Sequence, residues 1–245
     1  MREIKVQDGK ITLIFKKKSV VENFILKELS RSLKKARKFF ELSLFPIKIY
    51  LLDLREDFDR FAGKKTAAWE VGRTNCSQNT IYLLSPSAFE SDSIHKKRDF
   101  PKVLTHELIH LFTHQLYPFY EPHWLREGLA YFVADQGKAN SIEKLKLLFI
   151  NGNFLAKIDS STNWRKNLHK GVYQASFLWV SFLLKKFGKK KILSLLRETN
   201  FPYERAKFAK VFQQVYQQNL YFLQKQFAQI YLFQDLKRKE VKRKC

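Results

Sequence analysis

Strand-like and helical patterns of apolar and polar residues are mixed in the first hundred positions, and helical spacing dominates the rest of the chain. The segment EIKVQDGKITLIF (3–15) predicts two short strands joined by a hairpin turn at Asp8-Gly9. The other elements expected in this part are strands at 45–53 and 79–85, helices at about 20–40 and 54–63, and a loop at 64–78. The first of these helices is predicted to open with a capping-box pattern, SVVE (19–22).

From Asp99 onward, apolar residues recur three and four positions apart, which indicates helices. The expected helices are at about 99–117, 123–136, 141–150, 171–187, 189–198 and 202–232. The polar stretch SDSIHKKR (91–98) marks the expected boundary between the two kinds of pattern. We therefore predict an α+β fold with an N-terminal α/β subdomain (1–97), a helical subdomain (98–232) and a disordered basic tail (233–245).

The sequence THELIHLFTH (105–114) places two histidines and a glutamate on one face of the predicted helix at 99–117. The residues expected on the opposite, buried side are Leu104, Leu108, Leu111 and Phe112. Four residues of helix separate His106 from His110 by roughly 6 Å, so both imidazoles can bind one metal ion.

Glu107 lies beside these two histidines and can reach a water on the same ion. A carboxylate in that position can take a proton from the water and pass it to a leaving amine. The spacing therefore favours metal-dependent peptide hydrolysis. The alternative is a pair of surface histidines on an ordinary amphipathic helix.

A third metal ligand is needed, and the sequence offers two candidates. His114 shares the face but lies roughly 12 Å along the helix from His106, too far for a row of three residues to surround one ion. Glu127, within PHWLREGLAYF (122–132), is the better candidate, because the turn-rich link before it allows a second helix to fold back. On that helix Glu127 shares a face with Trp124 and Tyr131, and the neighbouring Gly128 would let the two helices approach closely.

HELIH (106–110) followed by PHWLREGLAYF (122–132) resembles the gluzincin metallopeptidases, in particular the peptidase MA-like group with its Trp-Leu-x-Glu-Gly-x-Ala pattern. The resemblance covers about 99–136 and extends weakly to VYQASFLWVSFLLKKFG (172–188). It implies a zincin-like fold, in which a small N-terminal α/β subdomain holds an edge strand over the metal helix and a mainly helical subdomain follows. NTIYLLS (79–85) is the expected edge strand.

The same resemblance implies one Zn2+ per chain, with His106, His110 and Glu127 as ligands and Glu107 as general base and acid. It also suggests Tyr173 as the donor that stabilises the oxyanion. Other donors that stay open are Tyr117, Tyr120, His123 and Tyr131. The chain departs from some gluzincins in carrying Tyr131 where they have an acid.

The net charge is +23, from 46 Lys and Arg against 23 Asp and Glu. This excess predicts attraction to polyanions, and the alternative is a lysine-rich surface that is simply solvated. Two cysteines, Cys76 and Cys245, do not make a disulfide framework. No signal peptide or membrane-spanning run is seen, since the longest apolar stretch, SFLWVSFLL (176–184), is too short. We expect no membrane span and a cytoplasmic location.

We therefore expect a zinc-dependent metallopeptidase that acts on a peptide or protein substrate, with weak polyanion binding through its basic surface. One alternative is a protease that acts on nucleic-acid-associated proteins, recruited by that surface. Another is an inactive peptidase-like binding module, against which the presence of Glu107 argues.

Overall fold

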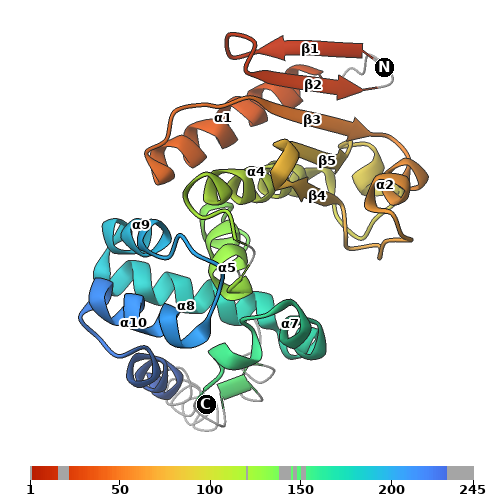
Figure 1. The fold of residues 1–245 in the computed structure, drawn as a ribbon. Coiled ribbons are helices and arrows are strands. Elements are labelled where there is room, and N and C mark those ends of the chain that lie inside the picture. Colours follow the sequence, from red (N-terminus) through yellow and green to blue (C-terminus); the bar gives the residue numbers. More distant parts are fainter. Residues whose placement is uncertain are drawn as a thin grey trace, which may run out of the picture. The chain divides into compact units, whose positions relative to one another are not determined.

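The computed structural model describes residues 2–15, 22–119, 121–137, 145, 148–149 and 153–230. Contacts within the chain divide it into two compact units (Figure 1). Unit 1 comprises Met1–Gln115 and Val133–Asp135, and unit 2 comprises Leu116–Phe132 and Gln136–Cys245. The fold contains both helices and a sheet, which confirms the α+β prediction. The predicted subdomain boundaries at 97/98 and 232/233 stay predictions. In the two compact units, the helix of the His-Glu-x-x-His motif belongs with the sheet in unit 1.

Unit 1 is built on a five-stranded sheet in the order β1-β2-β3-β5-β4. Its strands are β1 (Arg2–Val6), β2 (Ile11–Phe15), β3 (Ile47–Leu52), β4 (Gly72–Asn75) and β5 (Thr80–Leu84). The three inner strands are parallel to one another, and the two outer strands pair antiparallel to their neighbours. The predicted hairpin is confirmed, because Val6 pairs with Ile11 across a turn in which Asp8 and Gly9 have positive φ.

The predicted edge strand is wrong: β5 lies between β3 and β4, and β4 is the outer strand at that end of the described sheet. The run TIYLL in β5 is mostly apolar and is buried on both faces except for the half-buried Tyr82, which is typical of an interior strand. The predicted loop at 64–78 therefore contains β4 and a short 3-10 helix, η1 (Cys76–Gln78). The polar GRTN sequence of β4 carries no strand pattern, and its pairing with β5 makes it a strand.

The helices of unit 1 are α1 (Glu22–Phe40), α2 (Arg55–Ala62), α3 (Ala88–Ser91) and α4 (Phe100–Leu116), with a 3-10 turn η2 (Lys97–Asp99) before α4. Residues 19–21 of the predicted capping box lie outside the described residues. The four apolar residues expected on the buried side of α4 are all 1% exposed or less. Phe112 contacts the rings of Phe40 and Phe45, with centroid distances of 6.0 and 5.0 Å. This core fixes the orientation of α4 and of the motif on its other side.

The loop that leads into β4 is held by two side chains of α2. Arg55 donates hydrogen bonds to the Thr66 hydroxyl and to backbone oxygens, including those of Glu70 and Asp92. Asp59 accepts hydrogen bonds from the amide and the hydroxyl of Thr66, which hold the pKa of Asp59 below its usual value. The approach to β4 is therefore fixed by polar contacts.

Unit 2 is helical in its described parts and has an aromatic core. Its elements are α5 (His123–Val133), α7 (Ser161–Asn167), α8 (Val172–Phe187), α9 (Lys189–Glu198), α10 (Arg205–Tyr216), a helical stretch at 220–230, and the 3-10 turns η3 (Leu155–Lys157) and η4 (Leu168–Lys170). Trp179 is fully buried and contacts Trp124, Phe154 and Phe227. Most of the predicted helix at 141–150 and the whole basic tail lie outside the described residues.

The single helix predicted at 202–232 is wrong, because the structure has two helices there. α10 ends where Gln217 adopts a left-handed conformation, with φ of 55°. The side chain of Asn219 then accepts hydrogen bonds from the amides of Tyr221 and Phe222, which starts the next helix. Within the described ranges, no helix combines the length and the apolar character that crossing a membrane requires.

Candidate metal centre

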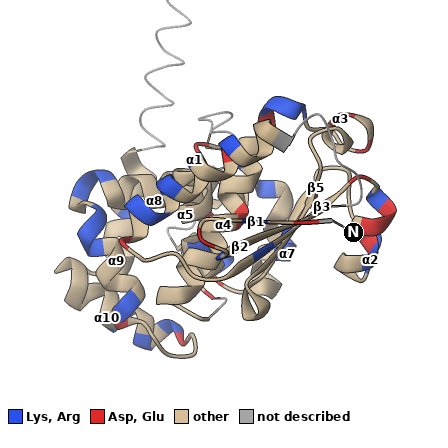
Figure 2. Cartoon of the chain, turned by 90° about the horizontal axis from the view of Figure 1, so that it is seen from above, with Lys and Arg blue, Asp and Glu red and all other residues tan. Residues whose placement is uncertain are grey.

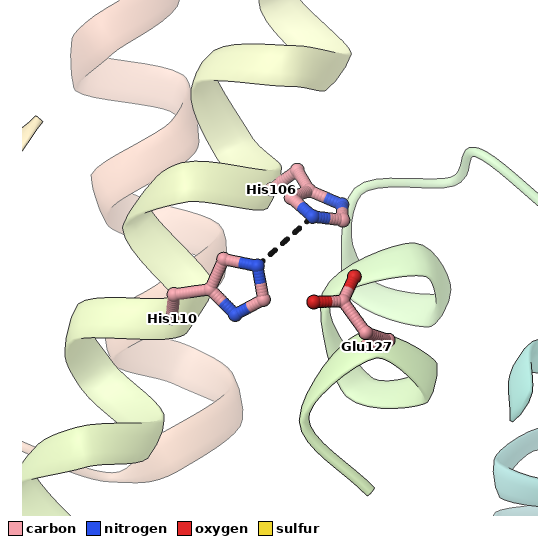
Figure 3. Close-up of side chains that lie close together, drawn as sticks. All are labelled: His106, His110 and Glu127. Atoms are coloured by element: carbon pink, nitrogen blue, oxygen red, sulfur yellow. Dashed lines mark hydrogen bonds between the residues drawn. The ribbon is translucent and has the colours of Figure 1, made fainter. Parts of the chain in front are cut away.

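The two histidines of the motif face each other on α4. Their Nε2 atoms are 3.0 Å apart, and the rings are nearly perpendicular (Figure 3). Two nitrogens bound to one tetrahedral zinc, at about 2.0–2.1 Å each, are about 3.3 Å apart. His110 is only 9% exposed, and His106 is half-buried. The pair is therefore arranged much as a shared ion would require.

Glu127 on α5 completes a group of three ligand-type residues. One ligand atom each from His106, His110 and Glu127 can be chosen so that all three lie within 4.8 Å of one another. Figure 3 shows the Glu127 carboxylate directed toward the two imidazoles. His114 is not part of this group, in agreement with the sequence argument from its distance.

The donor set fits a zinc ion of the catalytic kind. Zinc binds imidazole nitrogen and carboxylate oxygen at similar distances and prefers four ligands. Two histidines and one glutamate leave the fourth position for water or substrate. His106, His110 and Glu127 could therefore hold a metal ion.

Glu107 is directed to a different neighbour, the edge strand β4. Thr74 Oγ1 lies 2.6 Å from Glu107 Oε2 and 3.1 Å from the backbone oxygen of Glu107. Gly72 is so close that a Cβ added there would lie 2.8 Å from Glu107 Oε1. The glutamate is 7% exposed and is not one of the three grouped ligands. These two neighbours were missed from the sequence, where both fall in the predicted loop.

The helix that carries Glu127, α5, packs closely against another helix of unit 2. A Cβ added to Gly128 would lie 2.5 Å from the backbone oxygen of Ser176 and 2.5 Å from a methyl of Val180. The glycine thus allows α5 to approach the backbone of α8. From the sequence, Gly128 was expected to let α5 approach the helix of the His-Glu-x-x-His motif, whereas the neighbours that the structure shows for it lie on α8.

The tyrosine suggested as an oxyanion donor belongs to an aromatic row in unit 2. Tyr173 stacks on Tyr131 at a centroid distance of 5.4 Å and meets Trp164 edge-on at 5.0 Å. Tyr131 lies one helical turn after Glu127 on α5. Tyr173 therefore contacts a residue one helical turn from Glu127, and its catalytic role stays a prediction.

The other candidate oxyanion donors either contact neighbouring residues or lie outside the described residues. Tyr117 donates its hydroxyl hydrogen bond to the backbone oxygen of Glu121, and burial raises its pKa. Burial lowers the pKa of His123, whose ring lies 5.6 Å from that of Trp164. Tyr120 falls outside the described residues.

Comparison with known proteins adds no family to this description. No protein-family model matches the chain, and a search of curated proteins finds no match.

Proposed function

We propose that this protein is a zinc-dependent metallopeptidase of the gluzincin type, with a zincin-like fold. The observation that carries the proposal is the grouping of ligand atoms from His106, His110 and Glu127 within 4.8 Å. The resemblance of the two sequence motifs supports the same three residues.

The zinc ion, when bound, would make a water molecule acidic at neutral pH and polarise the scissile carbonyl. Glu107 is next to His106 in the chain and is not one of the three grouped residues, so we assign it to that water rather than to the ion. Its carboxylate takes a proton from the water while the water oxygen bonds to the carbonyl carbon. The same carboxyl group then gives the proton to the amine nitrogen as the carbon–nitrogen bond breaks.

The oxyanion donor is the second part of the proposal. We assign it to Tyr173, whose phenol belongs to the aromatic row beside the helix of Glu127. A phenolic hydroxyl can donate a hydrogen bond to the oxygen on which negative charge develops.

The basic charge does not change this conclusion. Lys and Arg residues lie on several helices of both units, including α1, α8, α9 and α10 (Figure 2). A distribution over many helices is expected of a solvated basic surface, and it gives no particular support to recruitment by nucleic acid. Metallopeptidase activity therefore stands as the single proposal.

Metal removal tests this proposal. We expect the protein to cleave peptides from a mixed quenched-fluorescence library, and to lose that activity when 1,10-phenanthroline removes the metal. About one equivalent of zinc per chain should restore the activity, because one tetrahedral site is proposed. The measurement is the initial rate before chelation, after chelation and after zinc is added back.

A non-chelating isomer, 1,7-phenanthroline, serves as the control. Activity that survives complete removal of the metal would contradict the proposal. So would a zinc-loaded protein that cleaves no peptide of the library.

A further inference from the structure

Two residues of the edge strand β4 lie against the carboxylate of Glu107, and all three residues belong to unit 1. Gly72 and Thr74 are separated by one position, so they face the same side of the strand. Both pair with β5, Gly72 with Leu83 and Thr74 with Ile81. The strand is therefore placed by the sheet rather than by the glutamate that it contacts.

Thr74 supplies a hydrogen-bond donor to one oxygen of the carboxylate. Its Oγ1 lies 2.6 Å from Glu107 Oε2, and the alternative acceptor, the backbone oxygen of Glu107, is more distant at 3.1 Å. A hydroxyl has one proton, and a charged acceptor at the shorter distance forms the stronger bond. The hydrogen bond thus holds Oε2 at a defined place.

Gly72 supplies the space for the other oxygen. A Cβ on residue 72 would lie 2.8 Å from Oε1 and 2.9 Å from Cγ of Glu107, closer than such atoms normally approach. Because Glu107 is only 7% exposed, the side chain has little room to move away. A glycine at this position is therefore required for the observed placement of the carboxylate.

The segment before β4 adds rigidity to this contact. Val71 is 3% exposed, and its backbone oxygen accepts a hydrogen bond from the amide of Leu84. Arg55 donates to the backbone oxygen of Glu70, one residue earlier. The backbone that leads into residue 72 is thus anchored at two successive positions, Glu70 and Val71.

We propose that β4 positions the general base: Thr74 holds Glu107 through its hydrogen bond to Oε2, and Gly72 leaves the space that this orientation needs. This inference rests on the proposed function and adds two positioning residues to it. A group that transfers protons must be held in the correct geometry, and a side chain with free rotation would meet that geometry less often. Neither residue is a metal ligand, so their effect is expected on turnover and not on zinc binding.

The test compares three variants of the zinc-loaded protein. Thr74→Val has a similar shape and lacks the donor, Thr74→Ser keeps the donor, and Gly72→Ala fills the space beside the carboxylate. We expect Thr74→Val to lower kcat about tenfold, with little change in KM and with the zinc content unchanged. Thr74→Ser should keep most of the wild-type kcat, whereas Gly72→Ala should lose at least as much as Thr74→Val. Thr12→Val on β2 controls for the same exchange elsewhere in the sheet.

A second readout does not depend on activity. In the metal-free protein, Thr74→Val should lower the midpoint of thermal unfolding by about 2–4 °C, because a buried hydrogen bond to a carboxylate is lost. In a Glu107→Ala background the same exchange should have a clearly smaller effect, because the acceptor is already absent.

The outcomes separate this inference from the proposed function. Two results together would overturn the positioning role, even if Glu107→Gln is inactive. Thr74→Val would have the wild-type kcat, and it would lower the unfolding midpoint by the same amount in the wild type and in Glu107→Ala. Loss of zinc from Thr74→Val, or a change in KM alone, would also overturn it. Full activity of Glu107→Gln would instead overturn the proposed function itself.

Discussion

Replacing Glu107 with glutamine is expected to lower the rate of peptide hydrolysis by about 10²–10⁴-fold while zinc stays bound. An amide has nearly the size of the carboxylate but cannot accept and return a proton at neutral pH. The side chain is 7% exposed and is not one of the three grouped ligands, so the exchange leaves the proposed ligands in place. The measurement is kcat/KM on the best library peptide, together with zinc content by elemental mass spectrometry.

Glu198→Gln is the matched control, since Glu198 is exposed at the end of α9. It should behave as the wild type in both measurements. Turnover of Glu107→Gln within a few-fold of the wild-type value would contradict the assignment of Glu107 as the general base.

Replacing Gly128 with alanine is expected to destabilise the protein strongly. The added Cβ would lie 2.5 Å from the backbone oxygen of Ser176 and from a methyl of Val180, so α5 and α8 would have to separate. Overfilling a well-packed core costs about 1–3 kcal/mol, and a backbone neighbour gives way less easily than a flexible side chain. The gain of about 1 kcal/mol in helix propensity offsets only part of this cost.

The measurement is the midpoint of thermal unfolding, which we expect to fall by about 5 °C or more. Ser194→Ala, at a half-buried position of α9, is the control for an alanine on a helix of the same unit and should change the midpoint little. A midpoint of Gly128→Ala equal to that of the wild type would contradict the close contact between α5 and α8.

The parts of the fold that depend on local pattern could be predicted from the sequence. Helical spacing correctly predicted that Leu104, Leu108, Leu111 and Phe112 are buried, because a regular helix fixes the direction of each side chain. The burial of Glu107 and His110 on the other side did not follow from that spacing. The hairpin at Asp8-Gly9 and the end of α2 at Gly63, which has φ of 68°, follow from residues that tolerate positive φ.

The parts that depend on pairing across the sheet could not be predicted. β4 is four residues of GRTN, and only its hydrogen bonds to β5 make it a strand. The segment 79–85 was expected to be a strand because it is apolar and β-branched, and its edge position was only implied by the family resemblance. A continuous apolar run of this kind is typical of an interior strand. Gly72 and Thr74 were therefore missed, since a loop gives no reason to expect contact with Glu107.

The candidate ligands could be predicted because two motifs with defined spacing carry them. Their grouping within 4.8 Å agrees with that expectation, while the identity of the ion and the reaction stay proposals. The helix that packs against Gly128 could not be predicted, because a glycine within a helix indicates that another element approaches closely but not which one. In the structure this element is α8, whose Ser176 and Val180 lie next to Gly128.

The zinc content of the wild type and of Glu127→Ala tests the central claim most directly. The protein should be purified without metal-affinity resin or added zinc and measured by elemental mass spectrometry, with Glu198→Ala as the control for loss of an exposed acid. We expect about one zinc per chain in the wild type and the control, and a large loss in Glu127→Ala, because a site with one of its three protein ligands removed binds zinc much more weakly. Zinc retained in Glu127→Ala, or a wild type that binds no zinc even after incubation with it, would contradict the site of His106, His110 and Glu127.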